Sequence, residues 1–233
     1  MADVTLKYKG ATIGELSESG SKTIETAGKY CEADILLEYV KPQGGGIVLP
    51  AEYQRVEWIS NANTARIDLG NIAENQKGVI LDMKFDIVPS STGIMAAYDS
   101  FGAAGTWFGI TSSGLAGVGT NGYFSFNALE RRTYTVNFTK NGVSVEADGV
   151  TVSRSGKSDN LGISLFAALN ANDYNCKATL YECKAFVQGG ICKYLIPCYR
   201  KVDNVIGLYD IINDRFFTNA NSGGNFTKGA DVN

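Results

Sequence analysis

Three short runs of alternating apolar and polar side chains follow one another in the middle of the sequence, and they restrict the fold more than any other feature. The runs cover residues 134–139, 143–147 and 150–152. Period-two alternation is typical of a β-strand with one buried face. Asn141-Gly142 and Asp148-Gly149 separate the runs, and such pairs tolerate the positive φ angles of tight hairpin turns. The pattern predicts an antiparallel meander of three strands.

The same alternation recurs along the chain. Val79 and every second residue after it up to Ile87 are apolar, which predicts a core strand. Further strands are expected at residues 93–98, 106–111, 161–169, 178–187 and 205–209. The glycine-rich stretch from Gly114 to Gly122 is interpreted as a mobile loop. No long stretch has the period of a helix, so the sequence predicts an all-β fold, a sandwich or barrel of many short strands.

A linker divides the chain. Pro42 is followed closely by glycines at 44–46, a composition typical of linkers. Before it, residues 4–8 and 35–40 alternate as strands, but a segment of about 40 residues rarely buries a stable core alone. We therefore expect it to be ordered by another chain, either a partner protein or further copies of itself. The expected domains are a small β module at 1–42, a linker at 43–46 and a β-sandwich at 47–233.

Charge and hydropathy exclude several classes of partner. The net charge is −3, and the basic residues are dispersed along the sequence, which argues against nucleic-acid binding. No apolar run approaches the roughly 20 residues that a membrane-spanning helix needs, and the N-terminus lacks the pattern of a secretory signal. We expect synthesis in a cytoplasm and no membrane insertion.

The sequence offers little for catalysis. It contains no histidine, which excludes Ser-His-Asp and Cys-His nucleophiles. A glycosidase needs two facing carboxylates, and the pairs on alternate strand positions are Asp82 with Asp86 and Glu146 with Asp148. Lys84 lies between the first two, as on a solvated strand face, and Asp148 belongs to a turn. We predict that the protein is not an enzyme, with a glycosidase as the poorer alternative.

The cysteines and one oxygen-rich stretch, residues 170–175, have side chains that can bind metal ions. The five cysteines are Cys31, Cys176, Cys183, Cys192 and Cys198. No pair has the spacing of a zinc site, so we predict free thiols. Asn170, Asn172 and Asp173 could supply oxygen ligands to Ca²⁺, but the turn preferences of Asn and Asp favour an Asx-rich turn. No cofactor is expected, and Ca²⁺ remains the alternative.

Carbohydrate binding is the functional option that the residues support. Sugars stack on exposed aromatic rings, while amides and carboxylates hold their hydroxyl groups. Suitable side chains lie in or beside predicted loops in the middle of the chain: Tyr98, Asp99, Trp107, Asn121 and Tyr123. Trp107 is the best candidate, and packing into the core is the alternative for each aromatic residue.

Both ends of the larger domain resemble a known family. The matching segments are 49–59 (LPAEYQRVEWI), 65–70 (ARIDLG), 196–198 (IPC), 206–210 (IGLYD), 215–219 (RFFTN) and 223–226 (GGNF). Together they resemble the opening and the end of a concanavalin A-like (LamG-like) domain, which is common in phage and prophage tail and surface proteins. The resemblance implies a jelly roll of two curved antiparallel sheets. It also implies decoration, attachment or host-surface binding rather than catalysis.

The N-terminal segment has its own resemblance. Residues 19–24 (SGSKTI), 26–31 (TAGKYC) and 34–35 (DI) resemble a short module of phage tail and structural proteins. The resemblance implies a bacteriophage virion protein of tail, fibre or capsid, which would be made in the bacterial cytoplasm. Residues 1–42 would bind other virion proteins in a homo-oligomer, and the sandwich would bind bacterial or mucosal glycans. The alternative is a dedicated carbohydrate-binding adhesin module without a structural role.

Overall fold

A computed structural model gives the fold of the 233-residue chain. It describes residues 3–8, 11–16, 35–40, 47–61, 64–70, 78–87, 93–97, 107–110, 115–118, 122–127, 130–139, 141–155, 162–167, 175–221 and 223–232. Side chains are described only within residues 47–110 and 130–232 of these ranges. The described residues form strands and turns without a helix, which confirms the all-β prediction. Accordingly, this part of the chain holds no helix with the length and apolar character to cross a membrane.

The chain divides into two compact units, Met1–Val48 and Leu49–Asn233. The first unit contains an antiparallel sheet in the order β2-β1-β3. Its strands are β1 (Asp3–Tyr8), β2 (Ala11–Leu16) and β3 (Ile35–Val40). The sequence pattern missed β2 because a bulge breaks its alternation: Lys7 pairs with Thr12, whereas Leu6 pairs with Gly14. A bulge adds one residue to a strand and shifts the period of two.

The second unit has a large antiparallel sheet with the main path β14-β13-β12-β7-β16-β17-β18-β19. In chain order these strands are β7 (Val79–Ile87), β12 (Arg132–Thr139), β13 (Gly142–Ala147), β14 (Val150–Ser155), β16 (Ala178–Val187), β17 (Gly190–Arg200), β18 (Val205–Asp210) and β19 (Arg215–Thr218). Three short strands complete the sheet: β4 (Tyr53–Arg55) beside β17, β5 (Ile59–Asn61) beside β16, and β20 (Phe226–Lys228) beside β5.

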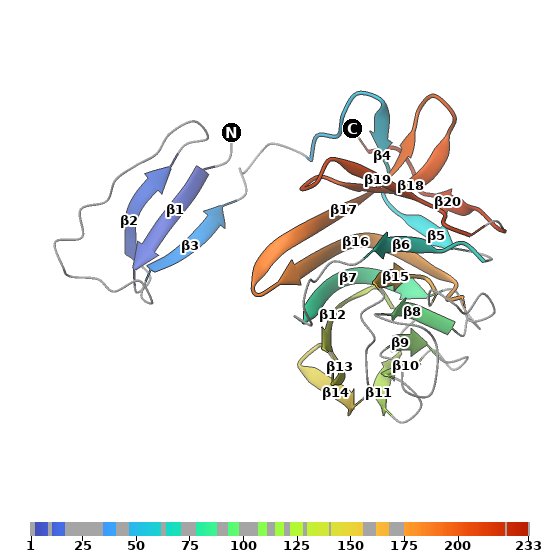
Figure 1. The fold of residues 1–233 in the computed structure, drawn as a ribbon, viewed down its shortest axis with the longest axis horizontal. Helices are drawn as coiled ribbons and strands as arrows, with labels where there is room; N and C mark the ends of the chain where they lie inside the picture. Colours follow the sequence, from blue (N-terminus) through green and yellow to red (C-terminus); the bar gives the residue numbers. More distant parts are fainter. Residues whose placement is uncertain are drawn as a thin grey trace. The chain divides into compact units, whose positions relative to one another are not determined.

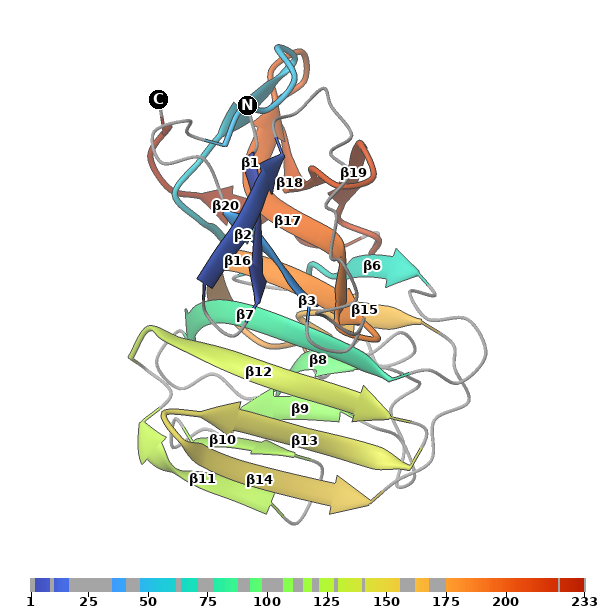
Figure 2. The same cartoon turned by 90° about the vertical axis from the view of Figure 1, so that its left-hand side faces the viewer.

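A smaller antiparallel sheet faces the large one, with the order β11-β10-β9-β8-β15-β6. Its strands are β6 (Ile67–Gly70), β8 (Gly93–Ala97), β9 (Trp107–Ile110), β10 (Leu115–Val118), β11 (Gly122–Asn127) and β15 (Ile163–Leu165). Figures 1 and 2 show the two layers from two directions, with β7 and β12 in one layer and β8 and β9 in the other. The second unit is therefore a β-sandwich.

Aromatic rings fill the space between the two sheets. Phe85 of β7 stacks on Tyr134 of β12 at 4.5 Å between ring centroids, and Phe108 of β9 contacts both rings from the other sheet, at 5.9 and 5.3 Å. All three side chains are fully buried. Each such ring buries a large apolar area, so this cluster joins the layers. The apolar positions of β7 are likewise buried, as predicted.

The predicted meander is confirmed with one correction. Asp148 and Gly149 form the second turn, with φ angles of 51° and 77°. The first turn differs by one residue, because Gly142 already pairs with Thr139 as the first residue of β13. A side chain at Gly142 would clash with the carbonyl of Arg154 on β14. This glycine is required by close packing between strands rather than by the turn itself.

The glycine-rich stretch in the middle of the chain contains a strand. The stretch from Gly114 to Gly122 was expected to be a mobile loop, yet Leu115–Val118 pairs on both sides, with β9 and β11. Glycines at 114, 117 and 119 conceal this strand from pattern analysis, since glycine offers no side chain to alternate.

The prediction of free thiols holds for the cysteines that the structure describes, Cys176, Cys183, Cys192 and Cys198. Cys31 lies outside the described residues.

Candidate functional site

Trp107 is the one predicted ligand residue whose side chain the structure describes. It pairs with Ala97 at the start of β9, and its ring packs against Ile94 and Ala97 in a small cluster apart from the main core. A methyl group at Gly109 would lie 2.9 Å from the indole, so this glycine gives the ring room to lie close to its own strand. The side chain is half-buried, and its role in ligand binding stays a prediction.

The side chains of the other predicted binding residues lie outside the described part of the structure. Tyr98, Asp99 and Asn121 lie outside the described residues, and Tyr123 is in β11, where only the backbone is described. The Ca²⁺ candidates Asn170, Asn172 and Asp173 also lie outside the described residues. Within the described part of the chain, no cluster of three or more His, Cys, Asp or Glu side chains is arranged to hold a metal ion.

The carboxylates considered for glycosidase chemistry have local partners. Asp82 accepts a hydrogen bond from the Thr135 hydroxyl at 2.7 Å, and Asp86 accepts one from Tyr181 at 2.7 Å. Glu146 accepts the backbone N–H of Gly149 at 2.9 Å. Asp148 pairs with Arg132. These contacts hold the strands and the turn, as their positions in the sequence indicated.

A different part of the sandwich has the shape of a binding site. A groove of about 420 Å³ opens where the turn after β17, strands β18 and β19 and the start of β20 come together. Its lining residues are Asp203, Asn204, Val205, Ile206, Thr218, Asn219, Asn225 and Phe226. The volume falls within the range of small-molecule sites. The lining thus combines polar residues with three apolar ones, of which Phe226 is buried.

Asp203 carries the fixed charge of this groove. Arg200 donates to both carboxylate oxygens, with distances of 3.1 Å from Nε to Oδ1 and 2.6 Å from Nη2 to Oδ2. The backbone N–H of Val205 donates to Oδ1 at 3.3 Å. The hydrogen bonds from Arg200 lower the pKa of Asp203 below its ordinary value of 3.8. The carboxylate is therefore ionised at neutral pH and held in one orientation.

Aromatic rings lie on the same sheet face beside the groove. Phe216 and the groove residue Thr218 occupy alternate positions of β19, and the half-buried rings of Tyr53 and Phe216 are 4.9 Å apart. Phe216 covers Gly207, because a methyl group there would lie 3.0 Å from the ring. Arg200 lies 5.7 Å from the ring centroid. A half-buried ring near amides and a carboxylate is an arrangement that can hold a sugar.

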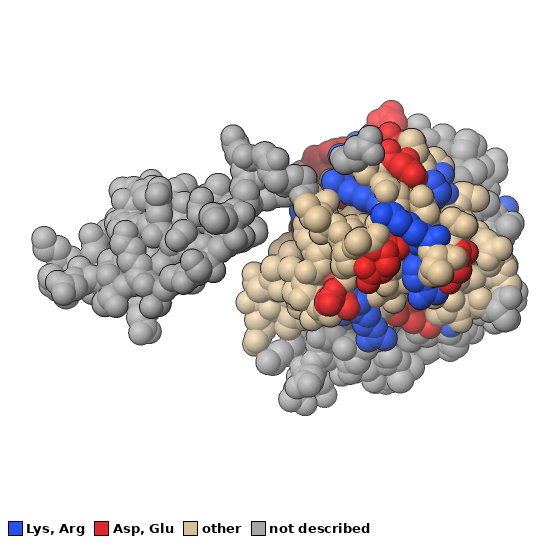
Figure 3. Space-filling view, turned by 90° about the horizontal axis from the view of Figure 1, so that it is seen from above, with Lys and Arg blue, Asp and Glu red and all other residues tan. Residues whose placement is uncertain are grey.

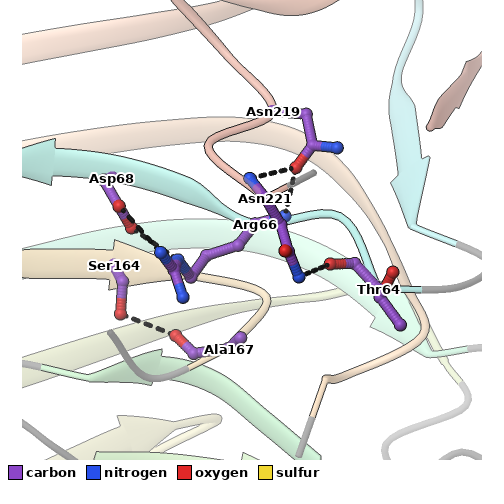
Figure 4. Close-up of polar contacts among 7 residues, drawn as sticks. All are labelled: Thr64, Arg66, Asp68, Ser164, Ala167, Asn219 and Asn221. Carbon is purple, nitrogen blue, oxygen red and sulfur yellow. Dashed lines mark hydrogen bonds and ion pairs between the residues drawn. The ribbon is translucent and has the colours of Figure 1, made fainter. Parts of the chain in front are cut away.

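Asn219 forms the back wall of the groove and is fully engaged (Figure 4). Its side-chain oxygen accepts the backbone N–H groups of Arg66 and Asn221, both at 3.0 Å, and its nitrogen donates to the carbonyl of Gly224 at 2.8 Å. Asn221 in turn donates to the carbonyl of Thr64 at 2.9 Å. Asn219 therefore joins the segment after β19 to the segment before β6. Its role is to position the groove rather than to contact a ligand.

Charged side chains near this end of the chain are used in local pairs. Figure 3 shows one face of the second unit, on which a row of basic side chains runs between groups of acidic side chains. Lys228 and Asp231 lie 2.7 Å apart, a second pair with the same sequence separation as Arg200 and Asp203. Exposed pairs of this kind add little stability.

Sequence reasoning identified the segments of this groove but not their function. Residues 206–210, 215–219 and 223–226 were the basis of a family resemblance, and Asp203-Asn204 is an ordinary turn sequence. The available signal was the concentration of Asn, Asp and Thr at strand ends near the C-terminus. Only strand pairing shows that these residues share one groove.

The chain has matches among known proteins in structure but not in sequence. No protein-family model matches the sequence, and no curated protein sequence matches it. Among solved structures, one similar chain is a mutant of Trypanosoma rangeli sialidase displaying trans-sialidase activity, with a TM-score of 0.44 and 12% sequence identity. The match covers 58% of this chain and 26% of that chain. The strand order and the buried core define the fold of this chain.

Proposed function

We propose that this protein is a bacteriophage virion structural protein of tail, fibre or capsid, whose concanavalin A-like sandwich attaches to glycans on the host surface. The observation that carries the binding function is the groove at the β17–β18 turn, whose lining combines Asp203, held by Arg200, with the amide and hydroxyl side chains of Asn204, Thr218 and Asn225. The virion context is supported by the resemblance of residues 1–42 to a phage structural module. In this proposal the first unit binds neighbouring virion proteins or further copies of the chain.

The groove has the chemistry that sugar recognition needs. Hydroxyl groups require both donors and acceptors, and the exposed side chains of Asn204 and Asn225 supply amides, while Asp203 supplies an acceptor. Val205 and Ile206 give an apolar surface for the C–H face of a sugar ring. Weak single sites of this kind become effective through multivalency when many copies stand on one particle.

The proposal is for binding without catalysis and without a resident cofactor. The chain has no histidine, and the four carboxylates considered for glycosidase chemistry are engaged with Thr135, Tyr181, Arg132 and the backbone of Gly149. A dedicated adhesin module would show the same groove without a structural role. Loss of particle incorporation on removing residues 1–42 distinguishes the virion protein from that alternative.

The test of glycan attachment is binding of the full chain to an array of bacterial and mucosal glycans. Asn225→Ala removes a groove amide, and Phe216→Leu replaces the neighbouring ring at nearly constant volume. We expect each to weaken binding to the preferred glycan by about tenfold or more, the range for one hydrogen bond or stacked ring. Thr151→Ala is the control, since Thr151 is exposed on β14 and does not line the groove.

Two results would contradict the proposal. One is that no glycan on the array binds the full chain, and the other is that Asn225→Ala and Phe216→Leu bind as the unchanged protein does. Release of reducing sugar from a polysaccharide panel would favour the glycosidase alternative instead. Thermal unfolding of each variant shows whether a loss of binding reflects a loss of folding.

A further inference from the structure

The charges of the groove indicate which class of glycan it can take. None of its lining residues is a lysine or arginine, whereas Asp203 contributes a carboxylate. The nearest cation described is Arg200, which donates to both oxygens of Asp203 and lies over the Phe216 ring. The positive charge of Arg200 is thus balanced within the protein, by Asp203 and the Phe216 ring. A ligand in the groove therefore meets an ion pair, and no lining residue supplies an unpaired cation.

The uncharged polar side chains of the groove are available to a ligand. In the described part of the chain, the side chains of Asn204, Thr218 and Asn225 make no hydrogen bond within the protein, in contrast to Asn219. Two carboxamides and one hydroxyl offer both donors and acceptors. With the carboxylate as a strong acceptor, they match vicinal hydroxyl groups of a pyranose.

We propose that the groove selects neutral pyranosides, such as hexoses and N-acetylhexosamines, and rejects glycans that end in a carboxylate or phosphate. This inference rests on the proposed glycan-binding function and specifies its ligand. Asp203, which already accepts three N–H groups, accepts one hydroxyl group, Asn204 and Asn225 hold the others, and the apolar residues Val205, Ile206 and Phe226 of the lining receive the C–H face. An acidic sugar would bring a carboxylate beside Asp203, whose cation Arg200 is already paired, and no lining residue would balance the added charge, which opposes binding.

The experiment compares pairs of related ligands, one neutral and one acidic. Binding of the full chain to glucose-terminated and glucuronate-terminated oligosaccharides, and to galactose-terminated glycans with and without terminal sialic acid, is measured by titration calorimetry or on an array. We expect the neutral member of the pair that binds to be favoured by about tenfold or more, as a like-charge contact near a surface predicts.

Asp203→Asn removes the charge while keeping the size of the side chain. We expect this variant to bind the neutral ligand at least about tenfold more weakly and to lose most of its discrimination against the acidic one. Asp231→Asn is the matched control, because Asp231 is another exposed acid paired with a cation three residues away, Lys228, and does not line the groove. It should leave both affinities unchanged.

The outcomes separate the two proposals. Preference for the acidic ligand, or unchanged discrimination in Asp203→Asn, overturns the assignment to neutral pyranosides while glycan binding stands. Binding of neither ligand class, by a protein whose thermal unfolding is cooperative, overturns glycan binding itself. Equal loss of affinity in Asp203→Asn and Asp231→Asn would also contradict the assignment, since it would show a general effect of charge.

Discussion

Lys193 of β17 and Asp210 of β18 form an ion pair, with a distance of 3.3 Å between Nζ and Oδ2. Asp210 is fully buried, and its carboxylate also accepts the backbone N–H groups of Tyr194 and Ile212, both at 3.1 Å, and the Asn213 amide at 2.7 Å. One side chain therefore holds two neighbouring strands and the turn that follows them. This anchor fixes the hairpin β18–β19, which forms one side of the groove.

Removing the acid should cost more stability than removing the base. In Asp210→Ala, the fully buried carboxylate is removed, and two partly buried backbone N–H groups and the Asn213 amide lose their acceptor; we expect a loss of about 3–5 kcal/mol in the free energy of unfolding. In Lys193→Met, Asp210 keeps three N–H donors, and we expect a loss of about 2 kcal/mol. Denaturant unfolding measures both, and a larger loss for Lys193→Met would contradict this account.

Two glycines of the meander should respond differently to alanine. A methyl group at Gly142 would collide with the Arg154 carbonyl, whereas Gly149 has no atom within 4 Å of that position. Gly149→Ala therefore costs only the strain of a positive φ, about 1 kcal/mol. Gly142→Ala must also separate β13 from β14, and we expect at least about 2 kcal/mol. Equal shifts in chemical denaturation would refute the close strand approach.

All five cysteines should be free thiols, and burial should make some of them slow to react in the native protein. Burial raises the pKa of Cys198 to about 12 and also raises the pKa of Cys183, so thiolate is scarce at neutral pH in the folded state. A colorimetric thiol assay should count five thiols in denaturant, and Cys183 and Cys198 should be slow to react in the native protein. A count of one thiol in denaturant, which corresponds to two disulfides, would show the prediction to be wrong.

Acidification should test the role of Asp203 in ligand binding. The pKa of Asp203 is lowered by Arg200, and a lowered pKa keeps the carboxylate charged until the pH falls through that value. Affinity for a neutral glycan should therefore be constant from about pH 8 to about pH 5 and decline only below about pH 4. The affinity of Asp203→Asn should lack this decline. A loss of binding centred near pH 6 would point to a different group.

Deletion of residues 1–42 should separate assembly from folding. These residues are too few to bury a stable core alone, and the edges of a three-stranded sheet can pair with a neighbouring chain. We expect the remaining sandwich to fold cooperatively yet fail to enter particles when phage are assembled in its presence. Normal incorporation of the truncated chain, judged by immunoblotting of purified particles, would contradict a role in assembly.

Local sequence determined the strands because side-chain alternation follows directly from strand geometry. The bounds of Val79–Ile87 and Ala178–Val187 could be predicted to the residue, because the alternation of side chains within each segment marks its buried face. Leu115–Val118 and Ala11–Leu16 could not. In the first, glycine removes the pattern, and in the second a bulge shifts it.

The groove was decided by tertiary structure alone. Asp203, Thr218 and Asn225 are separated in sequence and carry no shared period, and each is an ordinary residue for a turn or strand end. They meet because β18 pairs with β19 and β20 pairs with β5, and because Asn219 holds the segment between β19 and β20 against the residues that precede β6. Alternation specifies which face of a strand is buried. The choice of neighbouring strands depends on long-range hydrogen bonds and packing, which no short stretch of sequence contains.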